Sequence, residues 1–323
     1  MDKDFIALLH DVFASDSNDS SNLEFDSDDL VKICINGNIV QKMEGVFNLS
    51  EDNNYTSNFG DQWLKFRHTQ LDSYNGTSLS ESRFFDATGW SKESLKGRLI
   101  LDVGCGAGRF AEIALKYGAF LVAIDYSDAV YATSKNLEAY TNKVILKANI
   151  YDLPFSKGKF DKIYCLGVIQ HTPDPESAFK VLPELLKKDG ELCCDFYWKR
   201  FREYIKPKYY VRAITKYFTE QQIYKFLIKF HPFLYFLSNL ISYVPLLGKY
   251  LKLLVPIKNY KHDYPELNKV QLMEWSFLDT YDNWAPKYDY PQTKANLEKW
   301  ANDMELKNVK IFHAAHLVLR CNR

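Results

Sequence analysis

Twelve residues around position 100, Leu99-Ile-Leu-Asp-Val-Gly-Cys-Gly-Ala-Gly-Arg-Phe110, constrain the fold more than any other segment. An apolar run containing Asp102 is followed by three glycines at every second position. The run is typical of a buried parallel strand, and the glycines are typical of a tight turn whose backbone can approach a ligand. Apolar residues at helical spacing follow from Arg109. Strand, glycine turn and helix together predict a nucleotide-type site at the start of an α/β domain.

Two classes of ligand compete for this turn. Gly106-Ala-Gly-Arg-Phe-Ala111 matches the dinucleotide pattern G-x-G-x-x-A, and Asp125 lies about where a ribose-binding acid is expected. Asp102 favours the other class, because a carboxylate just before the turn repels a pyrophosphate and attracts an ammonium or sulfonium group. The charge therefore favours S-adenosylmethionine, whose methionine end carries a cationic amine.

Polar residues also follow the later apolar runs. The run 119–125 ends in Asp125-Tyr126, and Asn149-Ile150 follows the run 143–148. A fourth run, 160–168, contains Leu166 and leads into Ile169-Gln170-His171-Thr172. Runs and helical segments alternate at roughly 20–30-residue spacing, which predicts a parallel α/β sheet.

In this order, the motifs resemble those of class I S-adenosylmethionine-dependent methyltransferases, in particular type 11-like enzymes of polysaccharide and natural-product clusters. The resemblance spans about residues 95 to 200 and reappears near 300 to 320. It implies an α/β fold with a Rossmann-like seven-stranded sheet, helices on both faces and an antiparallel terminal hairpin. It also implies S-adenosyl-L-methionine as cofactor, held by Asp102, Gly104, Gly106, Gly108, Asp125, Tyr126, Asn149, Ile150 and Leu166. The family carries an acid at the position of Asn149. The amide oxygen of Asn149 can still accept a hydrogen bond from the adenine amine. Asp152 is the alternative residue for this adenine contact.

The N-terminal ninety residues precede this core. The acidic segment Asp16–Asp29 is expected to be mobile, and 30–49 is expected to form a hairpin with Asn36-Gly37 in its turn. Phe59-Gly-Asp-Gln-Trp63 is similar to a segment found ahead of such methyltransferase domains, where helices cover the cofactor. On this resemblance Trp63 would line the cofactor pocket, and Arg83 would form an ion pair with the carboxylate of the cofactor's methionine part. The alternative is that Trp63 packs in the core and Arg83 is a solvated helix residue.

Between the fifth strand and the terminal hairpin lies an insertion of about a hundred residues, far longer than a connecting loop. The chain carries 41 basic and 41 acidic residues overall, but residues 196 to 262 hold thirteen Lys or Arg and two acids. A helical cap over the active site is the first choice for this region. An amphipathic helix on anionic lipid, with peripheral membrane contact through 222–256, is an alternative. A transmembrane helix is disfavoured by Pro232 and Pro245, and no RNA-binding module accompanies the basic residues, so no nucleic acid is expected.

These observations predict five regions: 1–57, an acidic extension with a β-hairpin; 58–94, cofactor-covering helices; 95–199, the cofactor-binding core; 200–295, a basic and aromatic cap and acceptor region; and 296–323, the last helix and strands of the core. The six cysteines include no C-x-x-C pair, so no metal is expected. No signal peptide is recognisable, which predicts a cytoplasmic protein, with a peripheral membrane location as the alternative. The oligomeric state is not predicted.

The chemistry expected of such a site is methyl transfer to a hydroxyl group of a small molecule or a sugar or glycan precursor. A neutral hydroxyl is a poor nucleophile and gains from a positioned base. His171 follows the fourth strand at the edge where α/β sheets bind ligands, and it is the candidate base; the alternative is that it only shapes its loop. The candidate acceptor-binding residues are Gln170, Tyr197, Tyr209, Tyr281 and Trp284. A membrane-associated methyltransferase of a lipid or quinone, and a cofactor-binding protein without catalysis, remain as alternatives.

Overall fold

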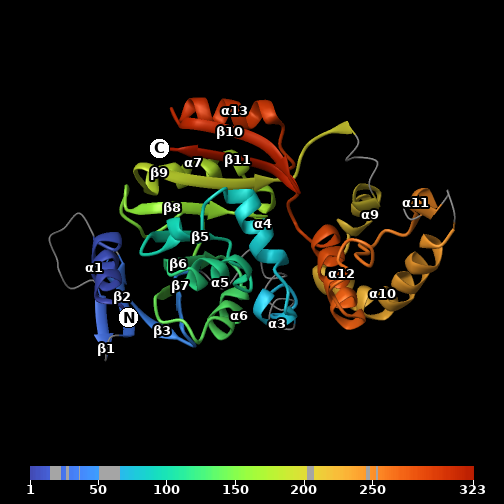
Figure 1. The fold of residues 1–323 in the computed structure, drawn as a ribbon, viewed down its shortest axis with the longest axis horizontal. Coiled ribbons are helices and arrows are strands. Elements are labelled where there is room, and N and C mark those ends of the chain that lie inside the picture. Colours follow the sequence, from blue (N-terminus) through green and yellow to red (C-terminus); the bar gives the residue numbers. More distant parts are fainter. Residues whose placement is uncertain are drawn as a thin grey trace. The chain divides into compact units, whose positions relative to one another are not determined.

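The computed structural model describes residues 1–14, 23–26, 29–35, 37–50, 66–201, 207–244, 248–251 and 254–323. The chain forms two compact units, whose elements Figure 1 labels. Unit 1 comprises Met1–Arg67, Ser78–Trp198 and Tyr288–Arg323, and unit 2 comprises His68–Thr77 and Lys199–Lys287.

Unit 1 is built on a sheet in which the described strands follow the order β1-β2-β3-β4-β7-β6-β5-β8-β9-β11-β10. The strands are β1 (Leu23–Asp26), β2 (Asp29–Ile35), β3 (Asn38–Met43), β4 (Val46–Asn48), β5 (Leu99–Val103), β6 (Phe120–Asp125), β7 (Lys143–Lys147), β8 (Phe160–Cys165), β9 (Leu186–Phe196), β10 (Lys307–Ala314) and β11 (His316–Asn322). From β7 to β9 the neighbouring strands are parallel, and β11 runs antiparallel to both β9 and β10. The predicted Rossmann-like class, with its antiparallel terminal hairpin, is confirmed.

The predicted number of strands is wrong. Phe47 pairs with Leu146 and Asn48 with Lys147 in a parallel ladder, so β4 joins β7 and the N-terminal strands extend the central sheet. The sheet therefore has eleven strands among the described residues instead of seven. The predicted hairpin exists as β2 and β3, but β1 lies inside the segment predicted to be mobile and pairs with β2. Covering β7 in this way removes an edge strand with unpaired N–H and C=O groups.

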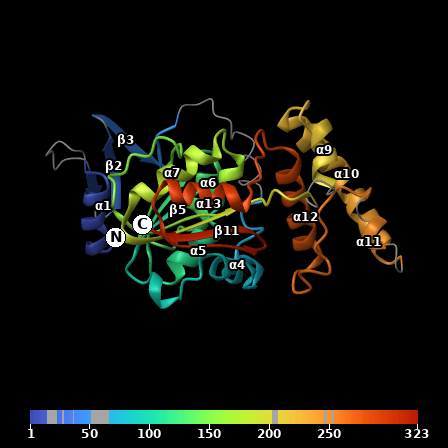
Figure 2. The same cartoon turned by 90° about the horizontal axis from the view of Figure 1, so that it is seen from above.

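Helices cover both faces of the sheet, as predicted. They are α1 (Lys3–Val12), α4 (Leu79–Thr88), η1 (Glu93–Leu95), α5 (Arg109–Lys116), α6 (Ala129–Asn136), η2 (Ile169–His171), α7 (Pro175–Leu185) and α13 (Lys294–Asp303). One buried cluster joins the sheet to α1, α7 and α13, and the other joins it to α4, α5 and α6. Figure 2 shows these layers from above.

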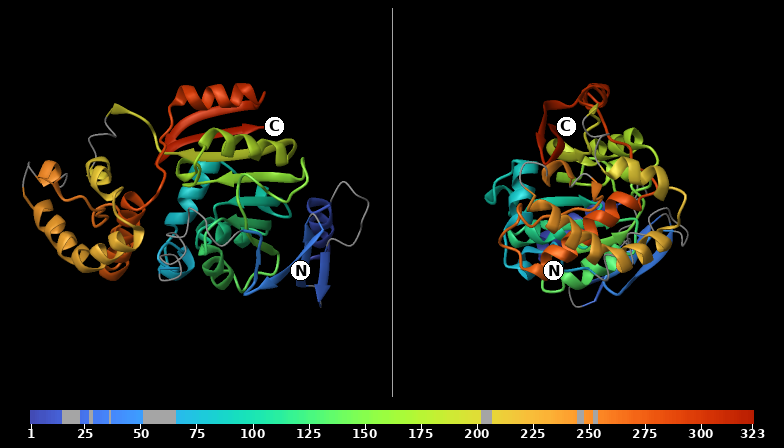
Figure 3. Two further views of the ribbon diagram at one scale, coloured as in Figure 1. Left: turned by 180° about the vertical axis from the view of Figure 1, so that it is seen from behind. Right: turned by 90° about the vertical axis from the view of Figure 1, so that its right-hand side faces the viewer.

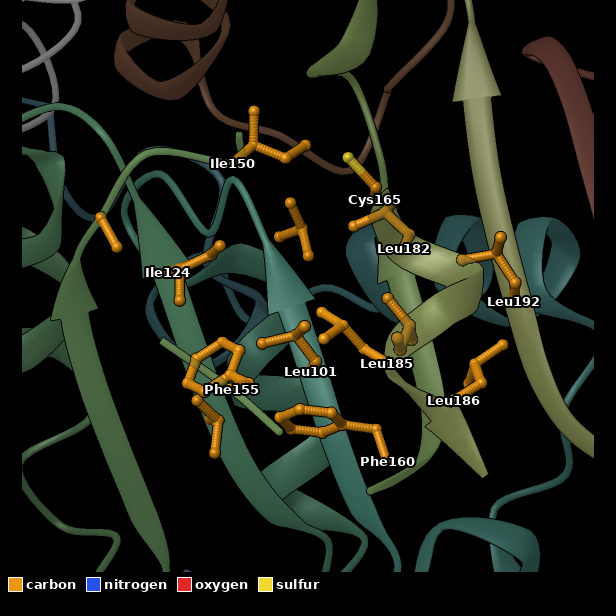
Figure 4. Packing of buried hydrophobic residues seen from close by; sticks show 14 of the residues in the cluster. Leu101, Ile124, Ile150, Phe155, Phe160, Cys165, Leu182, Leu185, Leu186 and Leu192 are labelled. Atoms are coloured by element: carbon orange, nitrogen blue, oxygen red, sulfur yellow. The ribbon is translucent and has the colours of Figure 1, made fainter. Parts of the chain in front are cut away.

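The alternation of side chains along β5 explains how one strand serves both clusters. Leu101 belongs to the cluster with α7, and Ile100 belongs to the cluster with α5, because successive strand residues point to opposite faces. Figure 4 shows Leu101, Ile124 and Leu192 from three strands packed near Leu182 and Leu185 of α7. Burial on both faces therefore holds β5, and the turn that follows it, in place.

Unit 2 is helical in its described part. Its helices are α3 (Asp72–Asn75), α9 (Pro207–Thr215), α10 (Glu220–Ser242), α11 (Gly248–Leu251) and α12 (Lys269–Trp284), drawn from two sides in Figure 3. Capping boxes begin α10 at Thr219 and α12 at Asn268. The two helices pack together, and Nε2 of the buried His231 lies 2.9 Å from Oγ of Ser276. Residues 68–77 belong to this unit although they precede the core in sequence.

Candidate active site

The carboxyl ends of the parallel strands bring the predicted cofactor residues to one edge of the unit 1 sheet. Asp102 is the second-last residue of β5, Asp125 ends β6, Asn149 follows β7, and Leu166 follows β8. Because neighbouring parallel strands end at the same edge, residues that are far apart in sequence share one site.

The glycine turn after β5 depends on backbone conformations that favour glycine. Gly104, Gly106 and Gly108 have φ values of 80°, 54° and 87°. The amides of Gly104 and Cys105 both donate to the carbonyl of Ile124, at 2.7 and 2.9 Å, which ties the turn to the end of β6. The turn ends at Gly108, and α5 begins at Arg109, so the amino end of a helix faces this edge.

Asp102 is the strongest indication of a cationic ligand. Its side chain is only 2% exposed, and within the described residues Oδ2 has no hydrogen-bond partner. Burial raises the pKa of its carboxyl to about 8; the side chain of Tyr164 lowers this pKa, and the nearby Asp125 raises it. A buried carboxylate oxygen without a hydrogen-bond partner is costly, and a bound ammonium group would supply that partner. This fits the amine of S-adenosylmethionine.

Asp125 is oriented by three hydrogen bonds from the chain itself. Oδ2 accepts from the amide of Gly106 at 2.9 Å, and Oδ1 accepts from the amide and hydroxyl of Ser127 at 2.9 and 2.7 Å. Burial raises the pKa of this carboxyl as well. A carboxylate offers about four acceptor positions, so accepting two ribose hydroxyls requires Ser127 or Gly106 to release one bond.

The residues expected at the adenine and around it lie after β6, β7 and β8. Oδ1 of Asn149 accepts from the amide of Tyr151 at 3.2 Å, and the alternative contact Asp152 is exposed. Ile150 and Leu166 are buried, with exposed fractions of 6% and 7%, and Tyr126 is half-buried. These positions offer apolar surface beside polar groups; the individual contacts stay predictions.

Arg83 reaches the same edge from α4. Its Nη2 lies 3.2 Å from Oδ2 of Asp195, a residue of β9 that is 1% exposed. The other oxygen of Asp195 accepts from the amide of Gly167, whose φ is 82°. The ion pair occupies one of the five N–H donors of Arg83, so pairing with a ligand carboxylate remains a prediction.

His171 and Gln170 lie together in η2, directly after β8. Nδ1 of His171 is 2.9 Å from the carbonyl oxygen of Tyr288, and its ring packs edge-on against Tyr197 at 5.3 Å between centroids. The segment that follows Tyr288 runs along this edge, since the amide of Tyr290 donates to the carbonyl of Gln170 at 2.8 Å. The side chain of Gln170 is fully buried, and its amide has no partner within the described residues.

The remaining candidates lie elsewhere in the chain. Trp63 is outside the described residues. Tyr209, Tyr281 and Trp284 belong to unit 2, where Tyr209 is half-buried. Tyr281 and Trp284 are 3% and 6% exposed, and Nε1 of Trp284 donates to the carbonyl of Pro256 at 3.1 Å. Their burial shows that they pack within unit 2; their role toward an acceptor stays a prediction.

Two contributors to this site escaped the sequence-based prediction. Asp195 holds Arg83 and Gly167, and an acid inside the apolar run Leu192-Cys-Cys-Asp-Phe196 was the signal that could have identified it. Tyr288 acts through its backbone carbonyl, for which the sequence has no signal.

The strand order, the glycine turn and the acids at the strand ends define a Rossmann-like methyltransferase core. Comparison with known proteins agrees, since residues 101–194 match a family model described as a methyltransferase domain. The chain therefore carries a class I S-adenosylmethionine-dependent methyltransferase domain of type 11, and S-adenosylmethionine is the cofactor of this class.

Two curated relatives each match about a third of this chain. The "ubiquinone biosynthesis O-methyltransferase" of Coxiella burnetii is 30% identical over 115 residues, covering 35% of this chain and 49% of the relative. The protein of that name from Alkalilimnicola ehrlichii is 36% identical over 101 residues, covering 30% and 41%. The chain thus spans about half or less of the length of these two curated relatives.

Among solved structures, the chain is similar to a magnesium protoporphyrin IX methyltransferase from Synechocystis with bound S-adenosylhomocysteine. The match covers 83% of this chain and 96% of that chain at 15% identity, with a TM-score of 0.44.

The first prediction concerns the glycine turn. A Cβ at Gly104 would lie 2.2 Å from Cγ2 of Val168, whereas a Cβ at Gly97, whose φ is 66°, would meet no described atom within 4 Å. Gly104→Ala should lower the free energy of unfolding by about 2–4 kcal/mol, because it adds a clash to the backbone strain. Gly97→Ala, the matched control, should cost only the strain, about 1–2 kcal/mol. Urea denaturation measures both, and equal losses would contradict the packing described for the turn.

Proposed function

We propose that this protein transfers the methyl group of S-adenosylmethionine to a hydroxyl oxygen of a small molecule or of a sugar or glycan precursor. The observation that carries this proposal is the orientation of His171 at the ligand-binding edge. A carbonyl oxygen can only accept, so the 2.9 Å contact with Tyr288 makes Nδ1 of His171 the donor. In the neutral ring Nε2 then carries the lone pair that a general base needs.

The proposed mechanism divides the work between two groups of residues. Bound S-adenosylmethionine supplies an activated methyl group. Asp102 would balance the charge of its amine, and Asp125 would accept from its ribose hydroxyls. The backbone of the glycine turn would approach it closely, because glycine has no Cβ. His171 accepts the proton of the acceptor hydroxyl at Nε2, while Tyr288 and the ring of Tyr197 hold the imidazole in one orientation.

Gln170 supports recognition of a polar acceptor beside this base. Its amide carries two donors and one acceptor oxygen, and none of them is satisfied by the described residues. A buried amide in this condition is uncommon, because unmade hydrogen bonds in the interior are costly. A hydroxyl-rich acceptor would supply the missing partners.

A quinone-like or lipid-like acceptor is the second candidate. Two curated relatives that match about a third of this chain are named ubiquinone biosynthesis O-methyltransferases. A ring hydroxyl would meet the same base as a sugar hydroxyl, so the base does not separate the two acceptor classes. A cofactor-binding protein without turnover is the third possibility.

Turnover with a matched pair of acceptors tests these alternatives. The full chain is incubated with S-adenosylmethionine and either a nucleotide-linked sugar or an alkyl-substituted catechol, and formation of S-adenosylhomocysteine is measured. Turnover with the sugar, with the methyl group on oxygen, supports the main proposal, and turnover with the catechol alone selects the second candidate. Binding of S-adenosylhomocysteine without turnover on either acceptor or on a wider panel of hydroxyl compounds would contradict both.

A further inference from the structure

The outer side of α10 presents large apolar side chains to solvent. Its second half exposes Phe233, Phe236 and Leu240 at 62%, 63% and 56%, and Tyr243, the residue that caps its carboxyl end, is 66% exposed. No charged residue occurs between Phe230 and Ser242. We call these four residues the α10 apolar face. A solvated helix normally carries polar groups on its outer side, so an aromatic face of this kind indicates an interaction surface.

The opposite side of the same helix is already used for packing within unit 2. Ile223, Leu227, His231, Tyr235 and Ser238 are at most 5% exposed and recur at helical spacing. α10 packs against α12 through this region, where His231 contacts Ser276. The helix is therefore anchored on one side and exposes apolar groups on the other. Among the described residues, no helix combines the length and apolar character needed to cross a bilayer.

Basic residues accompany the exposed aromatics. Nζ of Lys229 lies 5.3 Å from the ring centre of Phe230, and Nζ of Lys216 lies 4.9 Å from that of Tyr217, which is 79% exposed. Nζ of Lys261 donates to the hydroxyl of Tyr243 at 2.6 Å. Aromatic rings beside lysines are typical of segments that lie in a membrane interface, where rings reach the acyl boundary and ammonium groups stay among the headgroups.

Charge decides between a lipid surface and a second copy of this chain. Residues 196 to 262 contain thirteen basic and two acidic residues. Two such surfaces would repel each other, whereas an anionic lipid surface attracts them. We propose that the α10 apolar face docks on an anionic membrane surface, with Lys225 and Lys229 near the lipid phosphates. This docking is separate from the choice of acceptor in the proposed function.

Vesicle co-sedimentation of the full chain tests the proposal. The protein should bind phosphatidylcholine vesicles containing phosphatidylglycerol at least about tenfold more tightly than pure phosphatidylcholine vesicles, and high salt should reduce the difference. The triple variant Phe233→Ser, Phe236→Ser, Leu240→Ser should lose at least about tenfold in binding. Lys225→Gln and Lys229→Gln should each cost about fivefold on anionic vesicles only.

The chain offers a matched control on another element. Ile39 and Met43 of β3 are 69% and 70% exposed, so Ile39→Ser with Met43→Ser removes exposed apolar groups outside unit 2 and should leave vesicle binding unchanged. Absence of binding by the wild-type chain, or equal binding by the triple variant, would overturn the proposal. A wild-type dimer that the triple variant dissociates, without vesicle binding, would overturn it in favour of a second copy. Circular dichroism and S-adenosylhomocysteine binding of the triple variant separate this result from misfolding and from failure of the proposed function.

Discussion

Replacing Asp102 with Asn should weaken S-adenosylhomocysteine binding by roughly 30- to 150-fold, because it removes the charge that faces the ligand amine while keeping the shape of the side chain. The loss corresponds to about 2–3 kcal/mol, within the range for removing one partner of a buried charge pair. The variant should unfold no more easily than wild type without ligand, since Oδ2 of Asp102 has no partner among the described residues. Isothermal titration calorimetry measures the affinity.

Glu112 provides the control for this substitution. It is also a buried acid, 5% exposed, and its Oε2 has no partner among the described residues, but it lies in α5 and not at a strand end. Glu112→Gln should leave the dissociation constant within about threefold of wild type. If the Asp102→Asn variant binds S-adenosylhomocysteine as tightly as wild type, Asp102 does not contact the ligand amine.

The pH dependence of binding follows from the same residue. Burial raises the pKa of Asp102 to about 8, so below pH 8 the unliganded carboxyl is mostly protonated and must lose its proton before it can balance a cation. Affinity should therefore rise with pH, by up to about tenfold per unit, and level off near pH 8. Asp102→Asn should abolish this dependence, and a wild-type affinity that is flat from pH 6 to 8 would contradict it.

Replacing His171 with Gln should reduce kcat by about 10²- to 10⁴-fold, the range attributed to a general base. Gln keeps an uncharged polar side chain but cannot take up a proton, so S-adenosylhomocysteine affinity should stay within about threefold of wild type. Steady-state kinetics with the acceptor that supports turnover measure both effects.

His10 gives the control for a histidine elsewhere in unit 1. It is an exposed residue of α1, and His10→Gln should leave kcat unchanged. If His171→Gln retains full turnover, His171 only shapes the loop after β8, and the base must be sought elsewhere.

Local sequence patterns were sufficient to predict the parallel core. The runs ending at Val103 and Asp125 are buried along their whole length apart from Asp125 itself, and such runs are distinctive because both faces of the sheet are covered. The N-terminal pairing was not predictable in the same way. β4 has only three residues, Val46–Asn48, and its parallel pairing with β7 joins segments about a hundred positions apart.

The sequence predicted those parts of the site in which a side chain acts. It did not predict the part in which a backbone carbonyl acts. Asp102 and Asp125 were identifiable because an acid at the end of an apolar strand is unusual. The carbonyl of Tyr288 was not identifiable, since any residue type supplies the same group and only the fold brings it to His171. Similarly, only the fold shows that residues 68–77 pack with 199–287.

Titration of the full chain with S-adenosylhomocysteine at pH 7, in two buffers with different heats of ionisation, tests the cofactor site most directly. Saturable binding to one site per chain is predicted, with release of close to one proton, because the pKa of Asp102 is about 8 before the ligand amine binds. Absence of saturable binding at high micromolar ligand would contradict the assignment of this edge of the sheet as an S-adenosylmethionine site.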